Sequence, residues 1–137
     1  MTATVEPRQL RMFRNAMAGF PAVWRFLEPR HGCLDAETTN PLETMILRIS
    51  ASAESEAILV TLLRATDRQF MAEAQFPLAA WQSAKDFLES IALEAFVVGV
   101  DERSGTWSGS MILRSTDLER RRDFSYIRSW LGTYDLH

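Results

Sequence analysis

Large apolar residues recur at helical spacing near the start of the chain. The steps between them are 3, 4, 3, 4 and 3, which places them on one stripe of a helix. The stripe consists of Leu10, Phe13, Met17, Phe20, Trp24 and Leu27. Pro21 falls inside it, and a proline removes a helical hydrogen bond and clashes with the preceding turn. The pattern therefore predicts one helix kinked near Phe20, or two short helices, with Pro29 ending the segment.

Three runs with strand-like patterning follow. "TMILRISA" (44–51) and "RQFMAEAQF" (68–76) alternate apolar and polar residues, whereas "EAILVTLLRAT" (56–66) is apolar on both sides. The short polar links between the runs suit hairpins, so the pattern predicts an antiparallel meander. A strand with one solvated face should be polar at alternate positions. The middle run therefore needs cover on its second face, either from the first helix or from another subunit.

Pro77 can open a second helix, "PLAAWQSAKDFLESIALEA", with an apolar stripe along one side. The segments "FVVGVDE" (96–102) and "TWSGSMILRS" (106–115) predict a second hairpin. Residues 117–132 are ambiguous. Asp117 can cap a helix that begins at Leu118, which is the favoured interpretation, but "DFSYIRSWLG" also alternates as a strand does.

These elements predict one α+β domain over residues 1–137. We expect a single antiparallel sheet of about five strands, meander plus hairpin, packed by two or three helices. The order is helix, three strands, helix, two strands, and then a helix or strand. Residues 29–43, "PRHGCLDAETTNPLE", show neither period, so they predict a long connecting loop within the domain.

Charge and composition exclude several functions. The net charge is −3 and the isoelectric point is near 5.4, so neither nucleic acid nor an anionic membrane surface is an expected partner. No apolar run approaches the length that crosses a bilayer. A single cysteine forms no internal disulfide, and the first residues lack the apolar core of a signal peptide. We therefore expect a cytoplasmic protein.

The stretch "RHGCLDAE" (30–37) holds the residue types that best suit chemistry. His31, Cys33, Asp35 and Glu37 are spaced two apart, and all four types ligate metals. Neighbours two apart on an extended chain lie roughly 6.5–7 Å from each other, too far to close around one ion. No second ligand pair exists, and nothing orients His31 as a base for Cys33. The sequence therefore predicts a polar loop, with no catalytic residue, no metal and no cofactor.

Absence of recognisable chemistry favours a protein-binding module over an enzyme. Tryptophan and arginine are enriched at the energetic centres of protein interfaces. The aromatic residues without a place on a core stripe, and the arginines near them in sequence, are the candidate contacts. These residues are Trp107, Trp130, Tyr134, Arg114, Arg122 and Arg128. The rival interpretation is that the two tryptophans close the ends of the core.

The predicted order, helix, three strands, helix, two strands, helix, resembles that of the secretion chaperones that hold effector proteins before export. That resemblance implies a small acidic cytoplasmic homodimer with a polypeptide partner. Immunity proteins that neutralise a cognate toxin fit a small acidic domain equally well. The alternative is a small-molecule-binding domain, or a small enzyme, with a pocket between the sheet and the helices.

Overall fold

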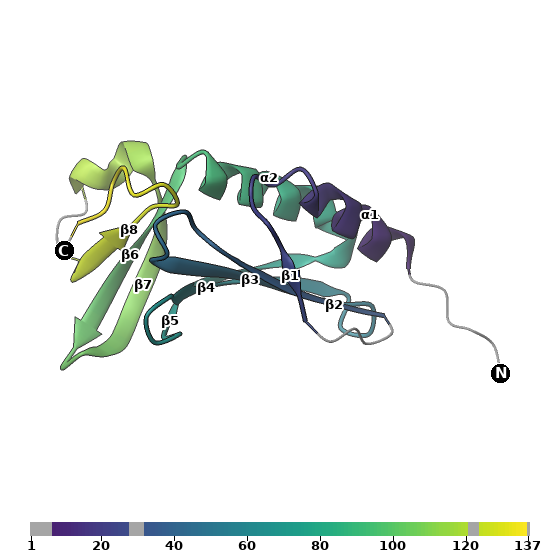
Figure 1. Ribbon diagram of the computed structural model, residues 1–137, viewed down its shortest axis with the longest axis horizontal. Helices are drawn as coiled ribbons and strands as arrows, with labels where there is room; N and C mark the ends of the chain where they lie inside the picture. The colour runs from purple at the N-terminus through teal and green to yellow at the C-terminus, as the bar shows by residue number, and fades with distance from the viewer. Residues whose placement is uncertain (1–6, 28–31, 121–123, 137) are drawn as a thin grey trace.

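The structure has an α+β architecture of two antiparallel sheets and two α-helices (Figure 1). The alternating apolar and polar residues over 44–77 form the expected antiparallel meander. The computed structural model describes residues 7–27, 32–120 and 124–136. The helices are α1 (Arg8–Met17) and α2 (Trp81–Ala92), with 3₁₀ helices η1 (Leu78–Ala80) and η2 (Ser115–Arg120). The strands are β1 (Arg25–Phe26), β2 (Cys33–Thr39), β3 (Met45–Ser52), β4 (Ala57–Arg64), β5 (Phe70–Pro77), β6 (Phe96–Arg103), β7 (Thr106–Arg114) and β8 (Tyr126–Arg128).

The strands form two sheets, so the prediction of a single sheet is wrong. One sheet has the order β1-β2-β3-β4-β5, and the other has the order β7-β6-β8. The β6–β7 hairpin forms as predicted, but no backbone ladder joins it to the meander. Its link to β5 is a side-chain contact, in which the indole N–H of Trp107 donates to the carbonyl of Met71 at 3.0 Å. The hairpin instead pairs with β8, a long-range partner that local patterning does not reveal.

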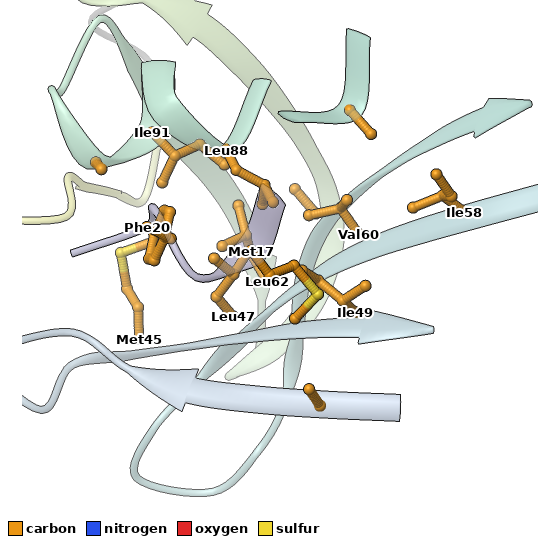
Figure 2. Close-up of a cluster of buried hydrophobic side chains, with 14 of the residues drawn as sticks. Met17, Phe20, Met45, Leu47, Ile49, Ile58, Val60, Leu62, Leu88 and Ile91 are labelled. Carbon is orange, nitrogen blue, oxygen red and sulfur yellow. The ribbon is translucent and has the colours of Figure 1, made fainter. Parts of the chain in front are cut away.

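Both helices pack against the same face of the five-stranded sheet (Figure 1). On β4, Ile58, Val60 and Leu62 point toward the helices and are at most 1% exposed. Figure 2 shows Leu62 and Val60 near Met17 of α1 and Leu88 of α2, with Ile58 farther along the strand. Burying a large aliphatic side chain stabilises the fold by roughly 1.5–3 kcal/mol. The helix layer is therefore held by one continuous core, and the opposite sheet face remains outside it.

The first helix is shorter than its apolar stripe. α1 ends at Met17, before Gly19 and Pro21, and the chain turns there. The stripe nonetheless stays on the core, because Phe20 is buried and the indole N–H of Trp24 donates to the Met17 carbonyl at 3.0 Å. The Met17 carbonyl also accepts from the Phe20 amide at 3.0 Å, so the indole binds an oxygen that the turn already uses and fixes Trp24 at the end of the helix.

The prediction of a loop over residues 29–43 is wrong, because most of the segment is the seven-residue strand β2. Leu34, Ala36 and Thr38 point into the core, and β2 pairs with β3 along its whole length. Alanine and threonine are weak markers of an inward position, so the alternation was hard to recognise. The tip between β2 and β3 is held by the side chain of Asn40, which accepts from the amides of Thr44 and Met45 at 2.8 Å.

Of the two interpretations of residues 117–132, the favoured α-helix does not appear among the described residues, whereas the strand alternative is realised at Tyr126–Arg128. Its described residues, 117–120 and 124–132, contain the end of η2 and the three-residue strand β8, which adds to the edge of β6. The chain then folds back so that Trp130, 1% exposed, packs edge-on against Phe20 with ring centroids 5.5 Å apart. The carboxylate of Glu94, just after α2, accepts hydrogen bonds from the Leu131 and Thr133 amides at 3.2 and 3.1 Å. Tertiary contacts, rather than local sequence pattern, therefore determine the conformation of this segment.

Candidate functional site

The five-stranded sheet has one face that no helix covers. We call it the outer face and define it by the side chains that alternate with the core positions. They are Cys33, Asp35, Glu37 and Thr39 on β2; Ile46, Arg48, Ser50 and Ser52 on β3; Ala57, Leu59, Thr61 and Leu63 on β4; and Phe70, Glu73, Gln75 and Pro77 on β5. In Figure 1 the helices lie above the sheet and this face points downward.

A carboxylate on β2 is held by two arginines. Glu37, 6% exposed, forms an ion pair with Arg25 of β1 and another with Arg68 of the β4–β5 turn, the latter at 2.9 Å. The hydrogen bond from Arg68, opposed by burial and reinforced by Arg25, lowers the pKa of the Glu37 carboxyl. To reach Glu37, the Arg68 side chain must cross β3. The arrangement ties the edge strand and the turn to the sheet, which is a structural role.

Arg48 lies at the centre of the outer face, half-buried. It stands opposite Glu37 in the β2–β3 register, but that carboxylate is bound by Arg25 and Arg68. Among the residues that the structure describes, its guanidinium has no hydrogen-bond or ion-pair partner. Its nitrogens still reach solvent, because among the described residues the Tyr126 hydroxyl is the buried side-chain polar atom without a partner. The position suits a carboxylate or a carbonyl supplied from outside the monomer.

Beside Arg48 the outer face is hollowed. The hollow has a volume of about 430 Å³ and runs between β2, β3 and β4. Its walls combine hydroxyls, an amide and apolar groups, including Ser50, Leu59 and Gln75. The Ser50 hydroxyl donates to the Asp35 carboxylate at 2.6 Å, which fixes both side chains. The hollow is open and shallow, and it is large enough for one or two side chains of a partner.

Apolar side chains run along the outer side of β4. Leu59 and Leu63 are half-buried there, although neither helix touches this side of the sheet. Thr61 lies between them. In the strand register it stands opposite Arg48 of β3 on one side and opposite Glu73 of β5 on the other. The sequence indicated that β4 needs cover on both faces. The first helix does not give that cover, because it packs on the same side as α2.

The "RHGCLDAE" residues fall on β2 and the link before it. Cys33, Asp35 and Glu37 share the outer face as alternation requires, and His31 lies outside the described residues. Within the described part of the chain, no group of three or more histidine, cysteine, aspartate or glutamate residues is close enough to hold a metal. Asp35 and Glu37 are already engaged, by Ser50 and by two arginines.

Five of the six predicted protein-contact residues are described by the structure, and they are spread over β7, β8 and the C-terminal segment. Trp107 is 37% exposed on the hairpin and packs edge-on against Phe70, with centroids 5.1 Å apart. Trp130 is a core residue, because burial of its indole leaves no surface for a partner. Tyr134 is 37% exposed in the C-terminal segment, and Arg114 is exposed at the end of β7. The guanidinium carbon of Arg128 lies 4.8 Å from the centroid of the Tyr126 ring, on which it stacks. Arg122, the last of the six, lies outside the described residues.

A second charged cluster connects the two sheets. Arg64, at the end of β4, bonds Asp67 at 2.7 Å and Glu102 of β6 at 3.3 Å. The hydrogen bond from Arg64 lowers the pKa of Asp67 to about 2. Burial raises the pKa of the nearby Tyr126 hydroxyl, which has no hydrogen-bond partner among the described residues. Because Arg64 is engaged on both sides, the cluster fixes the hairpin against the sheet.

Sequence reasoning missed Arg48 and Glu73 as site residues. The signal was present, since both occupy the polar positions of alternating strands, but two such charges look like ordinary solvated side chains. Their significance comes from the register, which sets them on either side of the apolar β4 column.

No family model, curated protein or solved structure matches this chain. The element order on which the resemblance to secretion chaperones was based also differs from the observed order, which has two strands, β1 and β2, between α1 and the predicted meander. In the described part of the chain, no helix has both the length and the apolar character that crossing a membrane requires.

Proposed function

We propose that this chain is a protein-binding module whose contact surface is the outer face of the five-stranded sheet. The observation that carries the proposal is the half-buried apolar column of β4, Leu59 and Leu63, which neither helix covers. Beside it lies Arg48, whose guanidinium has no partner among the residues that the structure describes. A polypeptide supplies what this surface lacks, namely apolar side chains for the column and carboxylates or carbonyls for Arg48.

Chemistry within the face supports binding rather than catalysis. The carboxylate of Glu37 is neutralised by Arg25 and Arg68, and Asp35 is bonded to Ser50. No nucleophile and base pair is formed by the described residues of this face. The hairpin residue Trp107 lies beyond β5 and can extend the contact surface, as the sequence suggested for it.

Site-specific photo-crosslinking tests the proposal. A photoreactive amino acid replaces Gln75, which is exposed on the outer face, or Gln82, which is exposed on α2 and serves as the matched control. Each variant is illuminated in the source cells, and its adducts are identified by mass spectrometry. We expect a discrete polypeptide adduct at position 75 and none at position 82. No adduct at position 75, or equal adducts at both positions, would contradict the proposal.

A second candidate function is the binding of a small carboxylate. The 430 Å³ hollow favours it, because hydroxyls and the Gln75 amide line the hollow next to Arg48. Such a ligand would cover the hollow and leave Leu63, further along β4, as exposed as before. Carboxylate-dependent thermal stabilisation that Arg48→Gln abolishes, without a polypeptide adduct at position 75, would favour this candidate.

A further inference from the structure

The edge of the five-stranded sheet at β5 carries backbone groups that no strand uses. β5 is the last strand of its sheet and pairs only with β4. Just after β5, the Leu78 amide donates to the carbonyl of Glu56, on the β4 side. Because backbone groups alternate in direction along a strand, the N–H and C=O groups of Glu73 and Gln75 point the other way, toward the open edge.

Both ends of this edge are protected. A register shift between Leu62 and Leu63 makes Met71 an extra residue of β5, and its carbonyl accepts from the Trp107 indole at 3.0 Å. At the other end, Pro77 closes the strand and has no N–H to donate. Bulges and prolines are devices that prevent a sheet edge from pairing with another chain. Here they protect the two ends of β5 and leave the stretch between them open.

The open stretch has no partner within the chain. No residue that the structure describes bonds the outward backbone groups of Glu73 or Gln75, and both residues are exposed. The hairpin does not fill the edge, because it meets the sheet at one end, where Trp107 packs on Phe70 (Figure 1). Two residues that direct both N–H and C=O outward can exchange hydrogen bonds with an added antiparallel strand.

Side chains on either side of this edge determine which strand fits it. On the helix side, the rings of Phe76 and Phe87 are half-buried with centroids 5.4 Å apart, and Phe96 of β6 lies 5.6 Å from Phe87. These rings favour apolar neighbours. On the outer side, Glu73 has no ion-pair partner among the described residues. A cation directly across the edge would make a favourable cross-strand pair with it.

We infer that β5 receives an extended segment of the partner polypeptide as an additional strand, with apolar residues toward the phenylalanines and a lysine or arginine opposite Glu73. The inference rests on the proposed function, because it states how the partner of the outer face is held. Backbone pairing supplies affinity, and the alternating side chains supply specificity. The other edges suit such a segment less well. β1 has two residues, the far edge of β8 is bridged by Leu136, and β7 carries no acidic residue.

Three synthetic peptides, each about seven residues long like an ordinary strand, test the placement. The first alternates valine and lysine, and the second alternates valine and glutamate. The third is the lysine peptide with N-methyl groups on its lysines, the residues that would exchange hydrogen bonds with Glu73 and Gln75. Each carries fluorescein, and its anisotropy is followed as the full chain is added at about 0.15 M salt, where long-range attraction is screened.

The lysine peptide should bind with a dissociation constant below about 1 mM. The glutamate peptide should bind at least about threefold more weakly, because it places a like charge opposite Glu73. The N-methylated peptide should not bind, since it cannot pair with the backbone of β5. In Glu73→Lys the order of the lysine and glutamate peptides should invert. The matched control Asp86→Lys makes the same change of charge at an exposed position of α2 and should keep the wild-type order.

A proline on the edge tests the backbone pairing separately. Gln75→Pro removes an outward N–H and leaves the β4 ladder intact, so it should weaken the lysine peptide about fivefold or more. On β7, alternation from Ser115, whose amide bonds the Ala95 carbonyl, points the N–H of Ser110 outward. Ser110→Pro is therefore the matched control and should leave peptide binding unchanged. Thermal unfolding checks that each variant is folded, and Glu73→Lys keeps the test decisive if Gln75→Pro is not.

The opposite results overturn the inference. They are no saturable binding of the lysine peptide up to about 1 mM, or equal binding of its N-methylated form. An unchanged peptide order in Glu73→Lys, or equal losses in folded Gln75→Pro and Ser110→Pro, also overturns it. If the peptides fail these tests but a photoreactive residue at position 75 still captures a discrete polypeptide, the proposed function stands and only the added strand is wrong.

Discussion

Glu94 holds the C-terminal segment in place, and its replacement gives a sharp test of the fold. Its carboxylate accepts hydrogen bonds from the amides of Leu131 and Thr133 and from the Thr133 hydroxyl. A hydrogen bond to a charged acceptor stabilises a fold by about 1.5–3 kcal/mol. Leu131 and Thr133 are exposed, so water can replace part of the loss. We therefore expect Glu94→Ala to lower the free energy of unfolding by about 3 kcal/mol.

In a chain of this length, about 3 kcal/mol corresponds to a fall of roughly 10 °C in the melting temperature. Glu94→Gln keeps an acceptor oxygen but loses the charge, and it retains the same left-handed backbone at position 94, where φ is 59°. We expect it to cost about 1 kcal/mol. Differential scanning calorimetry on both variants measures the difference. Glu89→Ala, which removes only a surface ion pair with Lys85, should shift the transition by less than about 2 °C.

The reasoning fails if Glu94→Ala melts within about 3 °C of the wild type. It also fails if the alanine and glutamine variants are equally damaged, because the acceptor oxygen would then have no role. Calorimetry and near-ultraviolet circular dichroism, which reports on packing of the aromatic side chains, should change together in the alanine variant.

Three further predictions concern the tryptophans, acid stability and a close approach. Trp130→Ala should cost about 4 kcal/mol of stability in urea titrations, and Trp107→Ala, 37% exposed, about half as much. Because the Glu37 pKa is lowered in the folded state, its contribution is present above the unfolded value of 4.5 and lost as pH falls through the folded pKa. In Glu37→Gln, the free energy of unfolding should therefore fall less steeply as the pH is lowered through the acid range. Gly99→Ala should destabilise the second sheet by about 1–3 kcal/mol, because the new β-carbon would meet the ring of Phe124 at 2.6 Å.

The parts of the fold that the sequence predicted are those in which local pattern and final environment agree. The meander strands and the β6–β7 hairpin lie where alternation placed them, and α2 falls inside the predicted helix. In each case the core side of the element is marked by large apolar residues such as Leu47, Val60 and Leu88. Burial on one face is the physical origin of both the pattern and the element.

The errors lie where the decisive contact is distant in sequence. β2 is inward-facing at Ala36 and Thr38, small or polar residues that give little periodic signal. Tyr126–Arg128 forms a strand because it pairs with the edge of β6. Trp130 is part of the core because its ring packs against Phe20. The number of sheets depends on whether β5 and the hairpin form a ladder, which neither segment determines alone.

The candidate site was predicted only in part. The sequence indicated that β4 needs cover on both faces, and the structure places α1 and α2 on the same side, so that the outer column of Leu59 and Leu63 is left without a helix. The charges beside the column needed the strand register. That register puts Arg48 and Glu73 in one row, which alternation within single strands cannot show.

Hydroxyl-radical footprinting in source-cell lysate gives the most direct test of the outer face as a protein-contact surface. Oxidation of Leu59 and Leu63 is compared with that of the purified chain at high dilution, with Val23 and Leu93, 91% and 80% exposed, as internal controls. We expect several-fold protection of both outer-face leucines in lysate and unchanged oxidation of the two controls. Equal oxidation of Leu59 and Leu63 in the two samples, or protection of the controls to the same degree, would contradict the account.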